Sequence, residues 1–119
     1  MLDDFAPVDQ VSELQIIDRV EGTGDTVAAG ATVTVDYTGA VAATGHVFQS
    51  SKDFGKPITF GLNQVIKGWT DGIPGMKVGG TRRLVIPAEQ AYGSRPPYGS
   101  GIPADAPLVF DVTLHAIEA

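Results

Sequence analysis

The chain has 119 residues, a length that suits one domain, and 43% of them are hydrophobic, which is enough for a compact core. Its formal net charge is −6 at pH 7, and no cluster of lysine or arginine offers the positive surface that a nucleic-acid partner needs. There are no cysteines, which excludes disulfides, thiolate nucleophiles and zinc–cysteine sites.

Residues 1–12 are acidic and contain Pro7, so we expect a leader that lies on the surface or frays, followed by one domain over residues 13–119. The first ten residues, MLDDFAPVDQ, contain no run of apolar residues, so we expect neither a signal peptide nor a membrane span in this chain. The expected location is the cytoplasm, with the cell envelope or the exterior as the alternative if an upstream signal has been removed.

Strand patterns follow in chain order. Residues 13–22, ELQIIDRVEG, are typical of a first strand that ends in turn residues. Residues 31–41 alternate, with Val33, Val35 and Tyr37 on one face, which predicts a half-buried strand. The AATG stretch predicts a hairpin connection to a partner strand, HVFQSS, and PITFGL predicts a short extended piece.

The next segment, VIKGWTDGIPG, has apolar residues at helical spacing but contains two internal glycines and a proline. Glycine costs a helix roughly 1 kcal/mol and proline about 3 kcal/mol, so we expect a helix of one or two turns. Its tryptophan, Trp69, is the largest apolar side chain of the protein. On the pattern alone this residue can be part of the core, an exposed anchor or the wall of a site.

Residues 79–88 predict another strand, in which Arg82 and Arg83 point to opposite faces and are expected to be solvated. Residues 93–107 form a loop rich in glycine and proline, and residues 108–119 predict a last alternating strand. Strands joined by short turns, without a βαβ rhythm, favour an α+β protein with an antiparallel sheet and one helix on a face.

Few residues offer chemistry. His46 and His115 share no ligand spacing with other histidines or carboxylates, so we expect surface residues and no metal. Ser50 and Ser51 have no partner base in the pattern of a catalytic triad, and no phosphate-binding loop is present. We therefore expect neither acid–base nor nucleophilic chemistry, and no cofactor.

What remains is a set of aromatic residues beside turns: Tyr37, Phe48, Phe60, Trp69, Tyr92, Tyr98 and Phe110. Most of them are expected in the core of so small a domain, and Phe60 is assigned there. Tyr92 and Tyr98 lie in or beside a loop that can bury little, a position more typical of a groove.

Six blocks, VIKGW, GMKVGG, RRLVIP, AYG, IP and LVFDV, stand in an order that resembles the FKBP-type peptidyl-prolyl cis–trans isomerases. The resemblance covers about residues 13–119 and implies a five- or six-stranded antiparallel sheet wrapped around one short helix. It further implies catalytic residues Tyr37, Phe48, Trp69, Tyr92 and Phe110, and substrate-binding residues Gln49, Ile58, Val65, Ile66, Tyr98 and Ile102. In this reading Trp69 is the floor of a pocket and the Ile66 N–H donates to a substrate carbonyl.

Two positions depart from the family pattern. Gln49 stands where the family has an aspartate, and Ile58 stands where it often has an aromatic. The resemblance implies an isomerase of Xaa–Pro bonds in peptides and folding proteins, needing no cofactor and binding macrolides such as rapamycin, and we expect a monomer. The alternative is a peptide- or macrolide-binding module with little catalysis, which the change at Gln49 favours slightly and the five aromatics oppose.

Overall fold

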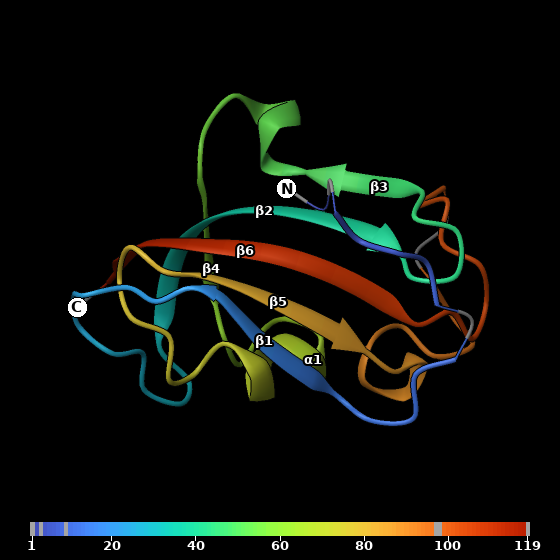
Figure 1. The fold of residues 1–119 in the computed structure, drawn as a ribbon, viewed down its shortest axis with the longest axis horizontal. Coiled ribbons are helices and arrows are strands. Elements are labelled where there is room, and N and C mark those ends of the chain that lie inside the picture. Colours follow the sequence, from blue (N-terminus) through green and yellow to red (C-terminus); the bar gives the residue numbers. More distant parts are fainter. Residues whose placement is uncertain (1, 3, 9, 97–98, 119) are drawn as a thin grey trace.

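The computed structural model describes residues 2, 4–8, 10–96 and 99–118. These form a six-stranded antiparallel sheet with one short α-helix, which confirms the predicted α+β architecture (Figure 1). The elements are β1 (Gln15–Val20), β2 (Thr32–Val41), β3 (Val47–Ser50), η1 (Ser51–Phe54), β4 (Ile58–Gly61), α1 (Lys67–Gly72), β5 (Thr81–Ile86), η2 (Ala88–Gln90) and β6 (Leu108–Ile117), where η marks a 3-10 turn. Within this described part, no helix has the length and apolar character required to cross a membrane.

The sheet has the order β1-β5-β6-β2-β3, and β4 also pairs with β2. Two ten-residue strands, β2 and β6, run side by side at its centre. The other edge of β2 is shared: its first half pairs with β4 and its second half with β3. The piece predicted only as extended is therefore a true strand, and the chain between β3 and β4 bulges out through η1 (Figure 1).

One face of the sheet carries the main core. The alternation predicted for β2 holds, because Val33, Val35 and Tyr37 are all buried there. Strands β5 and β6 add further apolar side chains to the same core: Leu84, Ile86, Leu108, Phe110, Val112 and Leu114. Helix α1 covers this face (Figure 1).

Two glycines let α1 lie directly on β5. A Cβ atom on Gly68 would stand 2.5 Å from Cγ2 of Ile86, and one on Gly72 would stand 2.7 Å from Cδ2 of Leu84. Real Cβ atoms do not approach so closely, so any larger residue would push the helix away from the sheet. The glycines that weaken the helix are therefore required for its packing.

The expectation that Arg82 and Arg83 are solvated is wrong. They are only 8% and 6% exposed, and each is paired with a carboxylate. On the outer face, Arg83 donates from Nε and Nη2 to the two oxygens of Asp111, at 2.7 and 3.0 Å. On the inner face, Arg82 is paired in the same way with Asp18. Buried charges require such partners, and neither partner is close in sequence.

The leader lies against the outer face of the sheet. Side chains of Leu2, Phe5 and Val11 pack on a small apolar patch formed by Ala40, Val85 and Val109. The backbone N–H of Leu2 donates to Asp111 at 2.8 Å, and that of Val8 donates to the carbonyl of Ala42 at 2.8 Å. Leu2, Phe5, Val8 and Val11 of the leader therefore contact the sheet, in agreement with the first of the two expected arrangements, a leader that lies on the surface.

Asp4 in this leader carries a pH dependence that can be measured. Its carboxylate is bonded to Arg19 and to Arg83, and these two hydrogen bonds hold the pKa of Asp4 well below its usual range. A depressed folded pKa means that the stabilisation is present above the unfolded pKa of about 3.9 and is lost as the pH falls through the lower folded value. We predict that Asp4→Asn lowers the free energy of unfolding at pH 7, and that the deficit shrinks below about pH 4.

Denaturant unfolding of both proteins between pH 7 and pH 2 measures this difference. Asp25→Asn, at an exposed aspartate whose side chain is in no ion pair among the described residues, serves as the control and should show no comparable deficit. A deficit for Asp4→Asn that stays constant down to pH 2 would contradict the assignment.

Candidate functional site

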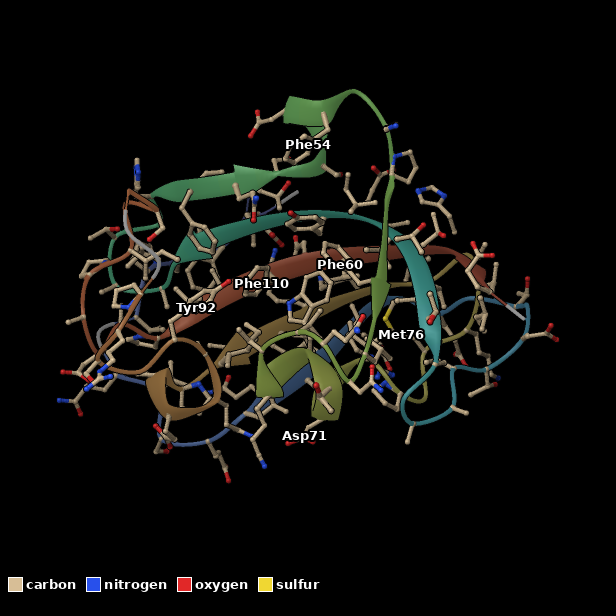
Figure 2. The ribbon with its side chains drawn as sticks, turned by 180° about the vertical axis from the view of Figure 1, so that it is seen from behind. Phe54, Phe60, Asp71, Met76, Tyr92 and Phe110 are labelled. Carbon is tan, nitrogen blue, oxygen red and sulfur yellow. The ribbon has the colours of Figure 1, made fainter. Side chains whose placement is uncertain are left out.

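A cavity of about 400 Å³ opens between α1 and the inner face of the sheet. Its volume is typical of a site for a small ligand. In Figure 2, Phe60, Phe110 and Tyr92 lie along this space, above the helix. Nine residues line it: Tyr37, Gln49, Phe60, Gln64, Val65, Ile66, Trp69, Tyr92 and Phe110.

Trp69 forms the centre of this site. Its indole meets three rings edge-on, those of Tyr37, Phe60 and Phe110, at centroid distances of 5.3, 5.2 and 5.4 Å. The interplanar angles of 85°, 78° and 87° are the T-shaped geometry that aromatic pairs favour. Because Trp69 is only 4% exposed yet lines the cavity, two of its three possible roles apply together: it belongs to the core and forms the wall of the site.

The indole Nε1 of Trp69 is buried and has no hydrogen-bond partner among the described residues. A buried donor without an acceptor costs about 1–3 kcal/mol, a cost that a phenylalanine in the same place would not carry. The tryptophan is therefore not the choice that stability alone favours, which indicates a role in the cavity.

Phe48 stands behind the cavity wall. Its ring meets that of Phe110 at 5.7 Å and 88°, but Phe48 is not among the lining residues. Gly39 makes room for both rings, since a Cβ atom there would lie 2.5 Å from Cε1 of Phe110 and 2.9 Å from Cζ of Phe48. Phe48 thus supports Phe110 and does not face the cavity itself.

Two residues assigned to substrate binding, Ile58 and Ile102, are not among the lining residues of the cavity. Ile58 is half-buried against the core, and Ile102 is buried within it. Tyr98 lies outside the described residues.

Two lining residues were missed by the sequence analysis, Phe60 and Gln64. The assignment of Phe60 to the core alone is wrong, because its half-buried ring contacts Trp69 and also faces the cavity. A signal was present, since Phe60 is one of the aromatic residues that lie beside turns, the group from which the other cavity aromatics were taken. No comparable signal marks Gln64.

The polar groups of the cavity are neutral. They are the hydroxyls of Tyr37 and Tyr92 and the carboxamides of Gln49 and Gln64, and none of the nine lining residues carries a charge. Burial raises the pKa of Tyr37, with smaller contributions from the nearby Tyr92 and Asp53, and burial alone raises the pKa of Tyr92. Both phenols therefore keep their protons at neutral pH.

The backbone offers one further donor among the residues that line the cavity. Ile66 precedes α1, and its carbonyl accepts from the N–H groups of Trp69 and Thr70 at 3.0 and 3.2 Å. Among the described residues its own N–H has no acceptor. A bound carbonyl group at the cavity wall can take this position.

The histidines and serines lie elsewhere. On the outer face, Nε2 of His115 is 2.6 Å from Asp36, whose other oxygen accepts from Ser51 at 2.8 Å. Ser50 caps η1, and His46 is exposed. In the described ranges, no three histidine or acidic side chains are grouped so that they could hold a metal ion. The cavity can hold a small apolar ring and bond its flanking amides, but it has no residue suited to move a proton at neutral pH.

Comparison with known proteins agrees with this geometry. The sequence profile of the FKBP-type peptidyl-prolyl cis-trans isomerase family matches residues 24–115. The chain is 43% identical to an FK506-binding protein of Streptomyces anulatus, over 96% of this chain and 94% of that protein. It is 48% identical to a probable FK506-binding protein of Corynebacterium glutamicum, over 86% and 85% of the two chains. A crystal structure of a peptidyl-prolyl cis-trans isomerase from Pseudomonas syringae pv. tomato superposes with a TM-score of 0.80 at 33% identity, covering 94% of this chain and 80% of that one.

The placement of Phe60 at the cavity wall and of Phe48 behind it can be tested by the fluorescence of Trp69, the only tryptophan. Both phenylalanines are half-buried, so each change to alanine should cost less than the roughly 3–5 kcal/mol of a fully buried ring. We predict that Phe60→Ala shifts the emission of Trp69 to longer wavelength, because it removes a ring contact and admits water. Phe48→Ala, which removes no contact with the indole, should leave the emission wavelength unchanged. Equal spectra for the two variants would show that Phe60 does not shield the indole.

Proposed function

This chain belongs to the family of FKBP-type peptidyl-prolyl cis–trans isomerases, and we propose that the cavity around Trp69 is where it accelerates rotation of Xaa–Pro bonds. The observation that carries the proposal is a cavity with an indole floor, two phenol hydroxyls and no charged lining residue. Such a site suits a proline ring with an amide on each side.

The chemistry of the reaction fits an uncharged site. An Xaa–Pro bond isomerises across a barrier of roughly 18–20 kcal/mol and takes tens to hundreds of seconds unaided. The planar amide is polar because of resonance, whereas the twisted amide has lost much of that charge separation. An apolar cavity therefore disfavours the planar state more than the twisted state, and this difference in binding lowers the barrier.

Individual lining residues have separate roles in binding the substrate. Trp69 lies under the proline ring, and Tyr37 and Phe110 hold it from the sides, with the rotating carbonyl oxygen resting against aromatic C–H edges. The N–H of Ile66 donates to a substrate carbonyl, and the hydroxyl of Tyr92 bonds the peptide chain. No step requires a cofactor or a proton transfer to the reacting bond.

Macrolides are the second class of ligand. The two bacterial relatives are named FK506-binding proteins, and we propose that an FK506-type macrolide or rapamycin occupies the same cavity of this chain. The cavity is formed within one chain, which supports binding by the monomer.

The competing function, a binding module with little catalysis, has one observation in its favour. Among the described residues the side chain of Gln49 makes no hydrogen bond with Tyr37, so the phenol lacks the partner that a carboxylate would offer. Against a binding module, all five aromatics assigned to catalysis are present at or directly behind the cavity.

The substrates that we propose for the isomerase are proline-containing peptides and folding proteins.

The proposal predicts faster cis–trans exchange in short Xaa–Pro peptides. Peptides with leucine or phenylalanine before the proline should react faster than those with glutamate, because the apolar rim of Val65 and Ile66 desolvates an apolar side chain at little cost. Rapamycin should inhibit the reaction. Rates equal to those without protein, at micromolar concentration, would refute catalysis, while activity that rapamycin leaves intact would refute only the shared cavity.

The two hydroxyls give a finer prediction. Tyr37→Phe and Tyr92→Phe remove a single oxygen that no described residue bonds, so the melting temperature should stay within a few degrees. Each change should lower kcat/KM by about 2- to 10-fold, the range of one hydrogen bond of about 0.5–1.5 kcal/mol. Phe54→Leu, at an exposed aromatic that does not line the cavity, is the control and should leave kcat/KM unchanged. Full activity in both tyrosine variants would remove the hydroxyls from the mechanism.

A further inference from the structure

Helix α1 is too short to keep its position without help from the sheet. It has six residues, two of them glycine, whereas isolated helices shorter than about 12–15 residues are marginal in water. No side chain caps its first residue, and its last turn contains no basic residue. Yet this helix carries Trp69 and begins directly after Ile66, so the geometry of the cavity depends on where it lies.

One buried side chain of the sheet holds the C-terminal end of the helix. Arg82 on β5 points to the inner face, and its Nη1 donates to the carbonyl of Gly72 at 2.8 Å and to that of Pro74 at 3.2 Å. The last carbonyls of a helix have no partner within it, and a positive charge at that end is favourable. In the middle of the helix, Oγ1 of Thr70 donates to the carbonyl of Leu62 at 2.5 Å.

A carboxylate on β1 orients this arginine. Asp18 accepts from Nε of Arg82 at 2.7 Å and from Nη2 at 3.3 Å, so the guanidinium is gripped along one edge and presents the other nitrogen to the helix. Bidentate pairs of this kind fix direction as well as charge. The chain of contacts therefore runs from β1 through β5 to the carbonyl three residues after Trp69.

We propose that Arg82 is a positioning residue for the isomerase site: by binding the carbonyls of Gly72 and Pro74 it fixes the C-terminal end of α1 against the sheet. The expected effect of Arg82 on catalysis rests on the proposed function, but its expected effect on the position of α1 does not. If the contact is lost, only packing against Leu84 and Ile86 holds the helix, and its C-terminal end is free to shift along the sheet. The Trp69 indole then leaves the positions in which it meets three rings at 5.2–5.4 Å. A misplacement of about 1 Å at a site can cost about 100-fold in rate.

The neighbouring residue provides a matched control. Arg83 is about as buried and is likewise paired with carboxylates, those of Asp111 and Asp4, but it points to the outer face and makes no hydrogen bond with α1 among the described residues. Arg82→Met and Arg83→Met should both lower the free energy of unfolding, because each leaves a carboxylate without its partner. General destabilisation is therefore common to the two variants, and only loss of positioning distinguishes them.

The experiment measures kcat/KM per folded molecule and the emission of Trp69, at a temperature where both variants are folded. We expect Arg82→Met to lower kcat/KM by about 10-fold or more and to shift the Trp69 emission, with Arg83→Met within about 2-fold of the parent protein and spectrally unchanged. Arg82→Lys keeps the positive charge but not the bidentate guanidinium, and it should lower kcat/KM by an intermediate amount. Equal activity per folded molecule in Arg82→Met and Arg83→Met, with equal spectra, would overturn the proposal.

A second variant covers the case in which Arg82→Met does not fold. Asp18→Ala removes a carboxylate whose side chain is 55% exposed, and it should lower kcat/KM and shift the emission in the same direction by a smaller amount. An unchanged spectrum and unchanged activity in Asp18→Ala would count against the proposal. If the parent protein has no isomerase activity, the proposed function fails, while the emission of Trp69 still decides whether Arg82 positions the helix.

Discussion

The indole of Trp69 is contacted edge-on by one ring from each of β2, β4 and β6, so three strands and the helix meet at one side chain. The other features of the inner face follow from this meeting. The helix must come close to β5, which requires glycine at positions 68 and 72. The ring of Phe110 needs space beside β2, which Gly39 provides. Because the helix ends after six residues, it covers only part of the inner face, and a cavity lined by Trp69 remains beside it.

Charge and apolar surface are separated across the sheet. The cavity side is lined by neutral groups, whereas the outer face holds the cluster of Arg83, Asp111 and Asp4 and the pair of His115 with Asp36. The exception is Arg82, whose charge lies on the inner face. This charge is neutralised by Asp18, and the guanidinium also donates to a carbonyl at the end of α1. This separation leaves a cavity in which a polar planar amide is poorly solvated, the property on which the proposed catalysis depends.

Much of the fold could be predicted because it depends on local patterns. The alternation in β2 and the glycines and proline around Trp69 specified the central strand and a short helix, and both are present. The burial and ion pairs of Arg82 and Arg83 could not be predicted from local patterns, because their partners lie 64 and 28 residues away along the chain. Phe60 was misassigned because burial and exposure to a cavity are compatible for a ring that is half covered. The pairing of β4 with β2 could not be predicted from the segment PITFGL alone, because its partner residues, Thr32 to Val35, lie elsewhere in the chain.

Catalysis of the rotation by an uncharged aromatic cavity involves no proton transfer. It can therefore be tested by the pH dependence of kcat/KM for an Xaa–Pro peptide without ionisable side chains, over the range in which the protein is folded. We expect a flat profile between about pH 6 and pH 9, because no lining residue has an ordinary pKa in that range and burial raises the pKa of both phenols. A sigmoidal or bell-shaped profile with a midpoint near about pH 6–7 would show that a histidine or a perturbed carboxyl takes part, and would contradict the account.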